Sequence, residues 1–251
     1  MTIFRGKLWI AAAMMFAAPF AVKAETHQPR AVVELFTSQG CNSCPPADKI
    51  LASYAESKDV LALSWHVDYW NYLGWKDTFS KAEFTDRQRR YAISMRRRQI
   101  YTPQAVVNGL DHVVGSRGGD LRNMIRAHEK AGKSPNVPIS VQHNGNSIKV
   151  DIQSDDAAHA DATLWMVYFN RSGKVKIARG ENRGKTITYH NVVRGTQMLG
   201  MLKAGQFSVE LHAGELGRMG HDACALILQK TTPEGTPGAI IGAAVIKDLN
   251  S

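Results

Sequence analysis

Two cysteines three positions apart, Cys41 and Cys44, are the residues of this sequence whose spacing most directly indicates chemistry. They follow an apolar run, Ala31–Phe36, that predicts a buried strand, and they precede apolar residues at helical spacing, so we expect a helix over 43–57. The N-terminus of a helix presents unpaired N–H groups and a partial positive charge, both of which stabilise a thiolate. We therefore expect Cys41 to be the nucleophile and Cys44, one turn further on, to resolve a mixed disulfide.

The residues around the pair favour this helix start. Ser43 can cap the helix, and Pro45 and Pro46 suit the first turn, where a missing N–H leaves no hydrogen bond unmade. Three alternatives stay open for the pair: a structural disulfide, a zinc site, and an idle disulfide in a fold that has lost its redox activity. The sequence has no second ligand pair at zinc-finger spacing.

A second candidate element is the dipeptide Thr102–Pro103, about 60 residues after the cysteines. It directly precedes a predicted strand, Gln104–Val107, and the hairpin signal Asn108–Gly109. We expect a cis peptide bond here, placed beside the cysteines, with the backbone of Thr102 available to pair with an extended partner peptide. The alternative is an ordinary trans proline in an edge strand.

Helical and strand patterns alternate in the first half of the chain and give way to short strands in the second. Between 31 and 131 the predicted order is strand, helix, strand, helix, strand, strand, helix, with a basic helix over 81–97 and a final helix over 121–131. A proline-containing linker follows at 134–138. The strands predicted after it are Ile139–Gln142, Ser147–Ile152, Thr163–Phe169, Lys174–Ala178, Thr186–Tyr189, Phe207–Leu211, Cys224–Gln229 and Ala239–Ile246.

The first half of the chain resembles the thioredoxin superfamily over about 30–131. Longer motifs are similar to those of a bacterial family of predicted secreted thioredoxin-like proteins with no assigned activity. The segments that carry this resemblance are Val32–Cys41, Ser43–Asp48, Trp65–Trp70, Leu73–Trp75, Tyr101–Gln104 and Gly180–Asn182. The resemblance implies an α/β thioredoxin-like domain over 25–133 and an exported protein. We expect an all-β, sandwich-like domain over 134–251.

The chain departs from common thioredoxin around the pair. Asn42 and Ser43 stand between the cysteines, where Gly and Pro are usual, and Gly40 replaces the aromatic residue that usually precedes the first cysteine. The buried acid of thioredoxin aligns with Leu35, which leaves Glu34, one position away, as the candidate acid. These departures bear on the redox potential of the pair and not on the type of reaction.

Three further candidates lie at or just after the carboxyl end of the second predicted strand, Val60–Val67. His66 and Asp68 come at its carboxyl end, where reacting groups gather in open α/β sheets. His66 can tune the Cys41 thiolate or shuttle a proton, or it can be a packed structural histidine. Trp70 belongs to an aromatic segment, 69–75, that can form an apolar rim for a peptide or the core of its own loop.

Other groups allow a functional and a structural interpretation. The arginines before Thr102 can attract acidic partners and favour a thiolate, or they can form a solvated helix face. They are Arg87, Arg89, Arg90, Arg96, Arg97 and Arg98. Cys224 lies in an apolar run and is expected to be a buried, inert thiol. Gly180–Gly184 predicts a turn, and its recurrence in the similar family suggests that it faces the domain that contains the two cysteines.

The first 24 residues predict a secretory signal peptide. Arg5 and Lys7 precede an apolar run, Leu8–Phe20, and Ala24 closes a cleavage motif. An uncleaved membrane anchor is the alternative. The formal net charge of +9 is not accompanied by a nucleic-acid-binding motif. We therefore expect a periplasmic or secreted monomer, with no membrane span after cleavage and no nucleic-acid partner.

Together these features predict an exported thiol–disulfide oxidoreductase that acts on envelope proteins or small-molecule thiols, with no cofactor and no metal. Cys41 attacks, Cys44 resolves, and Thr102 and Pro103 dock the partner, with Glu34, His66, Asp68 and Trp70 as supporting residues. Two other classes of function stay open. The same cysteines can bind a soft metal such as copper, or the fold can be a non-catalytic interaction module.

Overall fold

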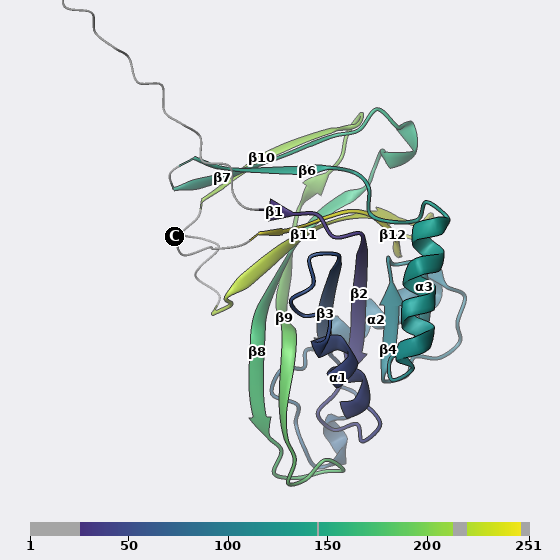
Figure 1. Ribbon diagram of the computed structural model, residues 1–251, viewed down its shortest axis with the longest axis vertical. Coiled ribbons are helices and arrows are strands. Elements are labelled where there is room, and N and C mark those ends of the chain that lie inside the picture. The colour runs from purple at the N-terminus through teal and green to yellow at the C-terminus, as the bar shows by residue number, and fades with distance from the viewer. Residues whose placement is uncertain (1–25, 145, 213–219, 247–251) are drawn as a thin grey trace, which may run out of the picture.

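The computed structural model describes residues 26–144, 146–212 and 220–246 (Figure 1). The predicted signal peptide lies outside these ranges and stays a prediction. The helices of the described residues are α1 (Pro45–Ala52), α2 (Ala82–Ser94) and α3 (Gly118–Lys130), with short 3-10 turns at Asn71–Leu73 and Ala157–His159. Among these residues no helix combines the length and the apolar character needed to cross a membrane.

The strands form two sheets. Those of the first half are β1 (Thr26–His27), β2 (Ala31–Thr37), β3 (Val60–His66), β4 (Gln104–Val107) and β5 (Asp111–Val114). Those of the second half are β6 (Ile139–Asn144), β7 (Ser147–Gln153), β8 (Thr163–Lys176), β9 (Thr186–Met201), β10 (Gln206–His212), β11 (Ala223–Thr231) and β12 (Pro237–Ile246).

A single mixed sheet of nine strands contains strands from both halves of the chain, in the order β1-β12-β11-β8-β9-β3-β2-β4-β5. β2 and β3 are parallel and are connected through α1, while β4 and β5 complete this edge as an antiparallel hairpin. β3 also pairs in parallel with β9, at Ser64 and Val192. The segments on the two sides of the predicted boundary at 133 and 134 therefore share a sheet, and a second sheet of β10, β7 and β6 packs beside it.

The hairpin of β8 and β9 is longer than the sequence pattern predicts. The pattern divides β8 near Gly173 into two short strands, but the structure continues it without interruption to Lys176. A Cβ atom at Gly173 would lie 2.7 Å from the ring of Phe79, so this glycine makes room for a packed ring and is not a turn. β9 likewise runs over 16 residues, and the hairpin carries its connecting tip, residues 177–185, to the end of the sheet where α1 begins (Figure 1).

The two faces of β2 contact different cores because alternate residues of a strand point to opposite sides. Val33 and Leu35 pack under α1 and α3. Val32 and Phe36 face the other core, which includes Phe84 and Tyr91 of α2. A third core lies between the smaller sheet and strands β8, β11 and β12.

A buried ionic cluster joins three elements inside the core on the α2 side. Glu34 on β2 is fully buried and accepts two hydrogen bonds from the Arg87 guanidinium, at 2.7 and 3.0 Å. The Tyr91 hydroxyl donates to the same carboxylate, and Arg87 also donates to Gln229 of β11 at 3.0 Å. The candidate acid Glu34 therefore serves this cluster and does not face α1, because its place in the strand alternation puts it on the opposite side from Leu35.

Removing the cation of this cluster is expected to destabilise the fold strongly. Arg87→Ala leaves the buried Glu34 carboxylate without its partner, and we expect the free energy of unfolding to fall by about 3–5 kcal/mol. Arg89, two positions on, pairs with Asp86 at the surface, and Arg89→Ala should cost no more than about 1 kcal/mol. Urea denaturation of the two variants measures both values, and similar losses would contradict this account of the cluster.

Candidate functional site

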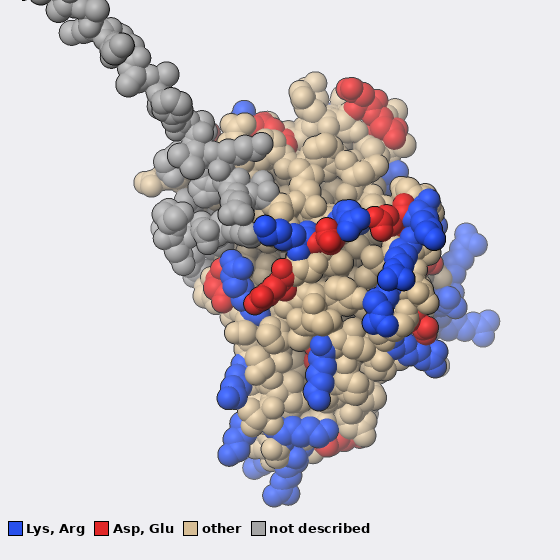
Figure 2. Space-filling model, in the orientation of Figure 1, with Lys and Arg blue, Asp and Glu red and all other residues tan. Residues whose placement is uncertain are grey.

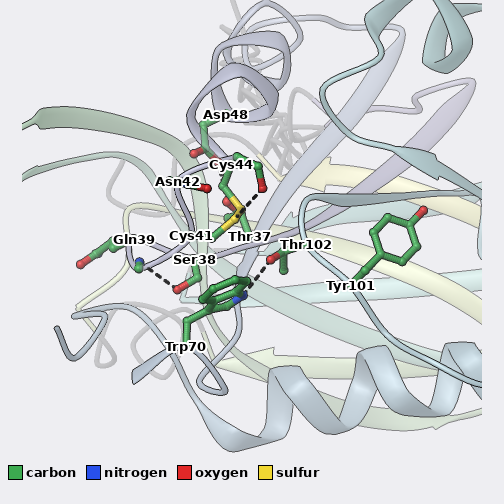
Figure 3. Close-up of a disulfide and its surroundings, with 12 residues drawn as sticks. Thr37, Ser38, Gln39, Cys41, Asn42, Cys44, Asp48, Trp70, Tyr101 and Thr102 are labelled. Atoms are coloured by element: carbon green, nitrogen blue, oxygen red, sulfur yellow. Dashed lines mark hydrogen bonds between the residues drawn. A yellow bond between two sulfur atoms is a disulfide. The ribbon is translucent and has the colours of Figure 1, made fainter. Parts of the chain in front are cut away.

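The two cysteines of the candidate site form a disulfide at the start of α1 (Figure 3). Their Cα atoms are 5.4 Å apart, and Cys44 is the N-cap residue of the helix, followed by Pro45 and Pro46. The cap makes no side-chain hydrogen bond, so the predicted capping role of Ser43 is wrong. The Ser43 hydroxyl instead lies 3.3 Å from Cys41 Sγ, within hydrogen-bond distance of this sulfur.

Both cysteines are fully buried in the disulfide form, with 0% exposure, while Asn42 and Ser43 between them are exposed. The sequence predicts a Cys41 that a partner can reach, and the oxidised structure does not show this. Two segments distant in the sequence cover the disulfide loop. One is the aromatic segment after β3, and the other is the tip of the β8–β9 hairpin.

Trp70 comes from the aromatic segment and lies beside the disulfide loop. A Cβ atom at Gly40 would lie 3.1 Å from Trp70 Cβ, so Trp70 fills the space that a side chain before Cys41 would take. The Trp70 indole N–H donates to Thr102 Oγ1 at 2.8 Å, which links the two segments (Figure 3). The aromatic residue that the sequence lacks at position 40 is thus supplied by another part of the chain.

The Thr102–Pro103 dipeptide reaches the same region, and its peptide bond is cis, as predicted. A Cβ atom at Gly115 would lie 3.2 Å from Ala47 Cβ and 3.3 Å from Pro103 Cβ, so Pro103 and the first turns of α1 approach each other across this glycine. Thr102 is partly exposed and Pro103 is buried. The backbone of Thr102 is therefore close to the surface beside Trp70.

The tip of the β8–β9 hairpin holds the disulfide loop through backbone groups. The buried Asn182 side chain donates one hydrogen bond to the carbonyl of Gln39 at 3.0 Å and another to the carbonyl of Cys41 at 2.8 Å. The carboxylate of Glu181 accepts a hydrogen bond from the backbone N–H of Asn42 at 3.3 Å. The turn contacts the segment that contains the two cysteines, as its recurrence in the similar family suggests, and these hydrogen bonds hold the loop that contains Cys41.

A buried acid lies one helical turn after Cys44. Asp48 accepts a hydrogen bond from Thr37 Oγ1 at 2.8 Å, and its own backbone N–H donates to the Cys44 carbonyl at 3.1 Å. Its second carboxylate oxygen, Oδ2, has no hydrogen-bond partner among the described protein groups. Burial raises the pKa of the Asp48 carboxyl to about 7, against the lowering effects of His66 and the Thr37 hydroxyl.

His66 and Asp77 continue this buried group below the disulfide. His66 Nδ1 lies 2.7 Å from Asp77 Oδ2, which also accepts the backbone N–H of Gln39 at 2.7 Å. Burial acts to raise the pKa of Asp77, but the influence of His66 and these hydrogen bonds outweighs it and leaves that pKa below the usual value. The ring of Tyr189 from β9 packs edge-on against His66, with centroids 4.7 Å apart. Among the described contacts none joins His66 directly to a cysteine, and its charge acts to lower the pKa of Asp48.

The structure thus separates the residues that the sequence proposes as a site. It brings together Cys41, Cys44, Trp70, Thr102 and Pro103 at one end of the sheet, with His66 beneath them. Glu34 lies in the opposite core, and Asp68 accepts a hydrogen bond from the Thr85 hydroxyl near the start of α2. In the sequence Asp48 stands out only as the last residue of the motif Ser43–Asp48, although its spacing of four residues from Cys44 places both on one helix face.

Among the remaining candidates, three arginines have structural partners and Cys224 is a buried thiol. Of the six arginines, Arg87 belongs to the Glu34 cluster, Arg89 pairs with Asp86, and Arg90 donates to the carbonyl of Gly235. Cys224 is buried on β11, and burial raises the pKa of its thiol to about 12, which agrees with an inert thiol. Within the described ranges, no group of three or more His, Cys, Asp and Glu side chains is arranged to hold a metal ion.

These features define the class of the molecule as a mixed α/β protein with a buried disulfide at the start of its first helix. The chain belongs to the family described as "protein of unknown function (DUF1223)", which matches residues 32–229. No curated protein matches the chain.

Solved structures similar to this chain include a protein from Agrobacterium tumefaciens and HBP35 of Porphyromonas gingivalis. The first is 37% identical, with a TM-score of 0.78, over 87% of this chain and 94% of that chain. The second is 14% identical, with a TM-score of 0.62, over 88% of this chain and 76% of that chain. At that identity the second likeness is one of fold alone.

Asn182→Ala is expected to uncover the disulfide. The change removes two hydrogen bonds to buried carbonyls, each worth about 1 kcal/mol, so we expect reduction of the oxidised protein by dithiothreitol to become about tenfold faster or more. Thr186→Ala, an exposed change four residues away, is the matched control and should leave the rate unchanged. Equal rates for the two variants would show that Asn182 does not limit access to Cys41.

Proposed function

We propose that this protein is a thiol–disulfide oxidoreductase of the thioredoxin type, exported to an oxidising compartment, in which Cys41 and Cys44 exchange electrons with a partner. The observation that carries the proposal is the Cys41–Cys44 disulfide at the start of α1, with the cis Thr102–Pro103 dipeptide near the same helix turns. A disulfide that closes so short a loop does little to constrain the unfolded chain, which favours exchange over a structural role.

The exchange reaction starts from the reduced protein, in which Cys41 and Cys44 are free thiols. The Cys41 thiolate attacks one sulfur of a partner disulfide, the partner S–S bond breaks, and its other sulfur leaves as a thiolate. Cys44 then loses its proton and attacks Cys41 Sγ, so the bond between Cys41 and the partner breaks and the second partner sulfur leaves. Two electrons pass to the partner, and the protein ends with the disulfide seen here. The same steps in reverse oxidise a partner dithiol.

Asp48 is suited to take the proton of Cys44 in the second step. It follows Cys44 by four residues on the same helix, it is buried, and its Oδ2 atom has no other partner among the described groups. A pKa of about 7 allows a carboxyl group to accept and release a proton near neutral pH. The pKa of Asp48 is also influenced by its neighbours: His66 and the Thr37 hydroxyl lower it, and Asp77 raises it.

The β8–β9 hairpin gives the second half of the chain a role in this function. In the oxidised form the tip is hydrogen-bonded to the backbone of the loop that contains the buried Cys41, so a partner that reaches the sulfur must move part of this loop or bind against the tip. The hairpin therefore controls which partners gain access. The proposed thioredoxin-like site therefore includes residues from both halves of the chain, because the hairpin tip holds the loop that contains Cys41.

Substitution of single cysteines tests the exchange. Cys44→Ser should trap a stable mixed disulfide on Cys41 with a model disulfide peptide, because no second thiol remains nearby to release it. Cys41→Ser should form none, and Cys224→Ser should behave as the natural protein does because Cys224 is buried and remote from the disulfide. Mass spectrometry under non-reducing conditions distinguishes these results, and failure of both Cys44→Ser and the natural protein to react would refute the proposal.

The role of Asp48 predicts a pH dependence. A base with a pKa of about 7 is ionised above that pH, so resolution of the mixed disulfide should accelerate as the pH rises through about 7. Asp48→Asn should remove this inflection and slow resolution about a hundredfold or more at higher pH. Asp68→Asn is the control, since Asp68 bonds to Thr85 away from the disulfide. Rapid-quench kinetics over the pH range decide the matter, and an unchanged inflection in Asp48→Asn would exclude this role.

Asp48 also affects stability, which should fall as the pH rises, whereas the rate of resolution should increase. Because burial raises the pKa of Asp48 in the folded state above its unfolded value, the folded protein binds the extra proton and loses stability as pH rises from about 4 to about 7. Asp48→Asn lacks this loss. The free energy of unfolding should therefore fall in the natural protein, relative to Asp48→Asn, as the pH rises from about 4 to about 7. The rate of resolution should differ between the two proteins chiefly above about pH 7, so the two measurements separate an effect on folding from an effect on proton transfer.

A further inference from the structure

The tip of the β8–β9 hairpin concentrates positive charge next to the disulfide. Residues 174–185 contain five cations and one acid. All five cations are exposed, and none of them forms an ion pair with another described residue. They are Lys174, Lys176, Arg179, Arg183 and Lys185. Figure 2 shows Lys and Arg side chains gathered at the lower end of the molecule, where the β8–β9 hairpin of Figure 1 lies.

The single acid of this segment is directed at the disulfide loop. Glu181 accepts the backbone N–H of Asn42, the exposed residue between the two cysteines. A carboxylate therefore already lies against the loop, among the cations of its own hairpin. The neighbouring Asn182 is buried and bonded to the Gln39 and Cys41 carbonyls, so it fixes the position of this charged segment relative to Cys41.

We infer that the tip of the β8–β9 hairpin is a docking surface for an acidic polypeptide segment of the partner that exchanges with Cys41 and Cys44. The inference rests on the proposed function, because it names the partner class of the same dithiol. Unpaired cations at the entrance to a reactive group attract opposite charge and raise its local concentration. A carboxylate of the partner can take the place of Glu181 at the Asn42 backbone N–H, and this exchange would place the partner against the loop between the two cysteines.

The docking surface can be tested without any redox step. The probe is a cysteine-free peptide rich in glutamate, compared with the same peptide in which glutamine replaces every glutamate. The oxidised full-length protein should bind the glutamate peptide on the order of tenfold more tightly at about 20 mM salt, and the preference should shrink at about 300 mM salt as the charges are screened. Isothermal titration calorimetry measures each affinity.

Variants of the hairpin give opposite expected shifts. The double change Arg179→Gln with Arg183→Gln should weaken binding of the glutamate peptide on the order of tenfold. Glu181→Gln should strengthen it, because the competing carboxylate is gone. The matched control is Arg122→Gln with Arg126→Gln, two exposed cations of α3 beside Arg30 and Asp59, at the far end of β2 from the disulfide. This control should retain the natural affinity.

The outcomes separate this inference from the proposed function. Equal affinity for the two peptides, or equal losses in the hairpin and α3 variants, would overturn the acidic docking surface even if disulfide peptides are still turned over. Preference for the glutamate peptide, lost only in the hairpin variant, supports it. Preference without any turnover of a glutamate-flanked disulfide peptide would leave the surface in place and refute the exchange reaction.

Discussion

The candidate site depends on the two hydrogen bonds from the Asn182 amide to the carbonyls of Gln39 and Cys41. These groups belong to a loop without regular secondary structure, and buried carbonyls without partners would be costly there. Asn182 satisfies both at once and so fixes the loop before α1 in one conformation. The cover over Cys41, the position of Glu181 and the placement of the hairpin cations all follow from this contact.

The strand before the disulfide explains why two buried acids have different roles. Glu34 points to the α2 side of β2 and is neutralised by Arg87, so it belongs to a rigid ionic cluster. Thr37, three positions later, points to the α1 side and bonds to Asp48. The Glu34 carboxylate has a cationic partner in Arg87, whereas the Asp48 carboxyl bonds, among the described groups, only to the Thr37 hydroxyl, and burial raises its pKa to about 7. Because alternate side chains of β2 point to opposite faces, the ionic cluster of Glu34 lies on one side of the strand and Asp48, which can exchange a proton near pH 7, lies on the other.

Local features of this chain could be predicted from sequence, and long-range ones could not. The strand before Cys41, the prolines at the start of α1 and the cis bond at Pro103 depend on neighbouring residues, and each is found. The pairing of β3 with β9 and the length of β8 depend on contacts such as that of Phe79 with Gly173, which local patterns do not encode. Glu34 lies away from the cysteines for a related reason, since one step along a strand reverses the face of a side chain.

The distance along the chain between Asn182 and the loop it holds has a consequence for biosynthesis. Asn182 follows Cys41 by 141 residues, so during N-to-C synthesis the two cysteines emerge long before the segment that covers them. The nascent chain therefore passes through a stage in which both sulfurs are open to oxidants and thiols of the surroundings. The disulfide can be set in this interval, and completion of the hairpin then encloses it.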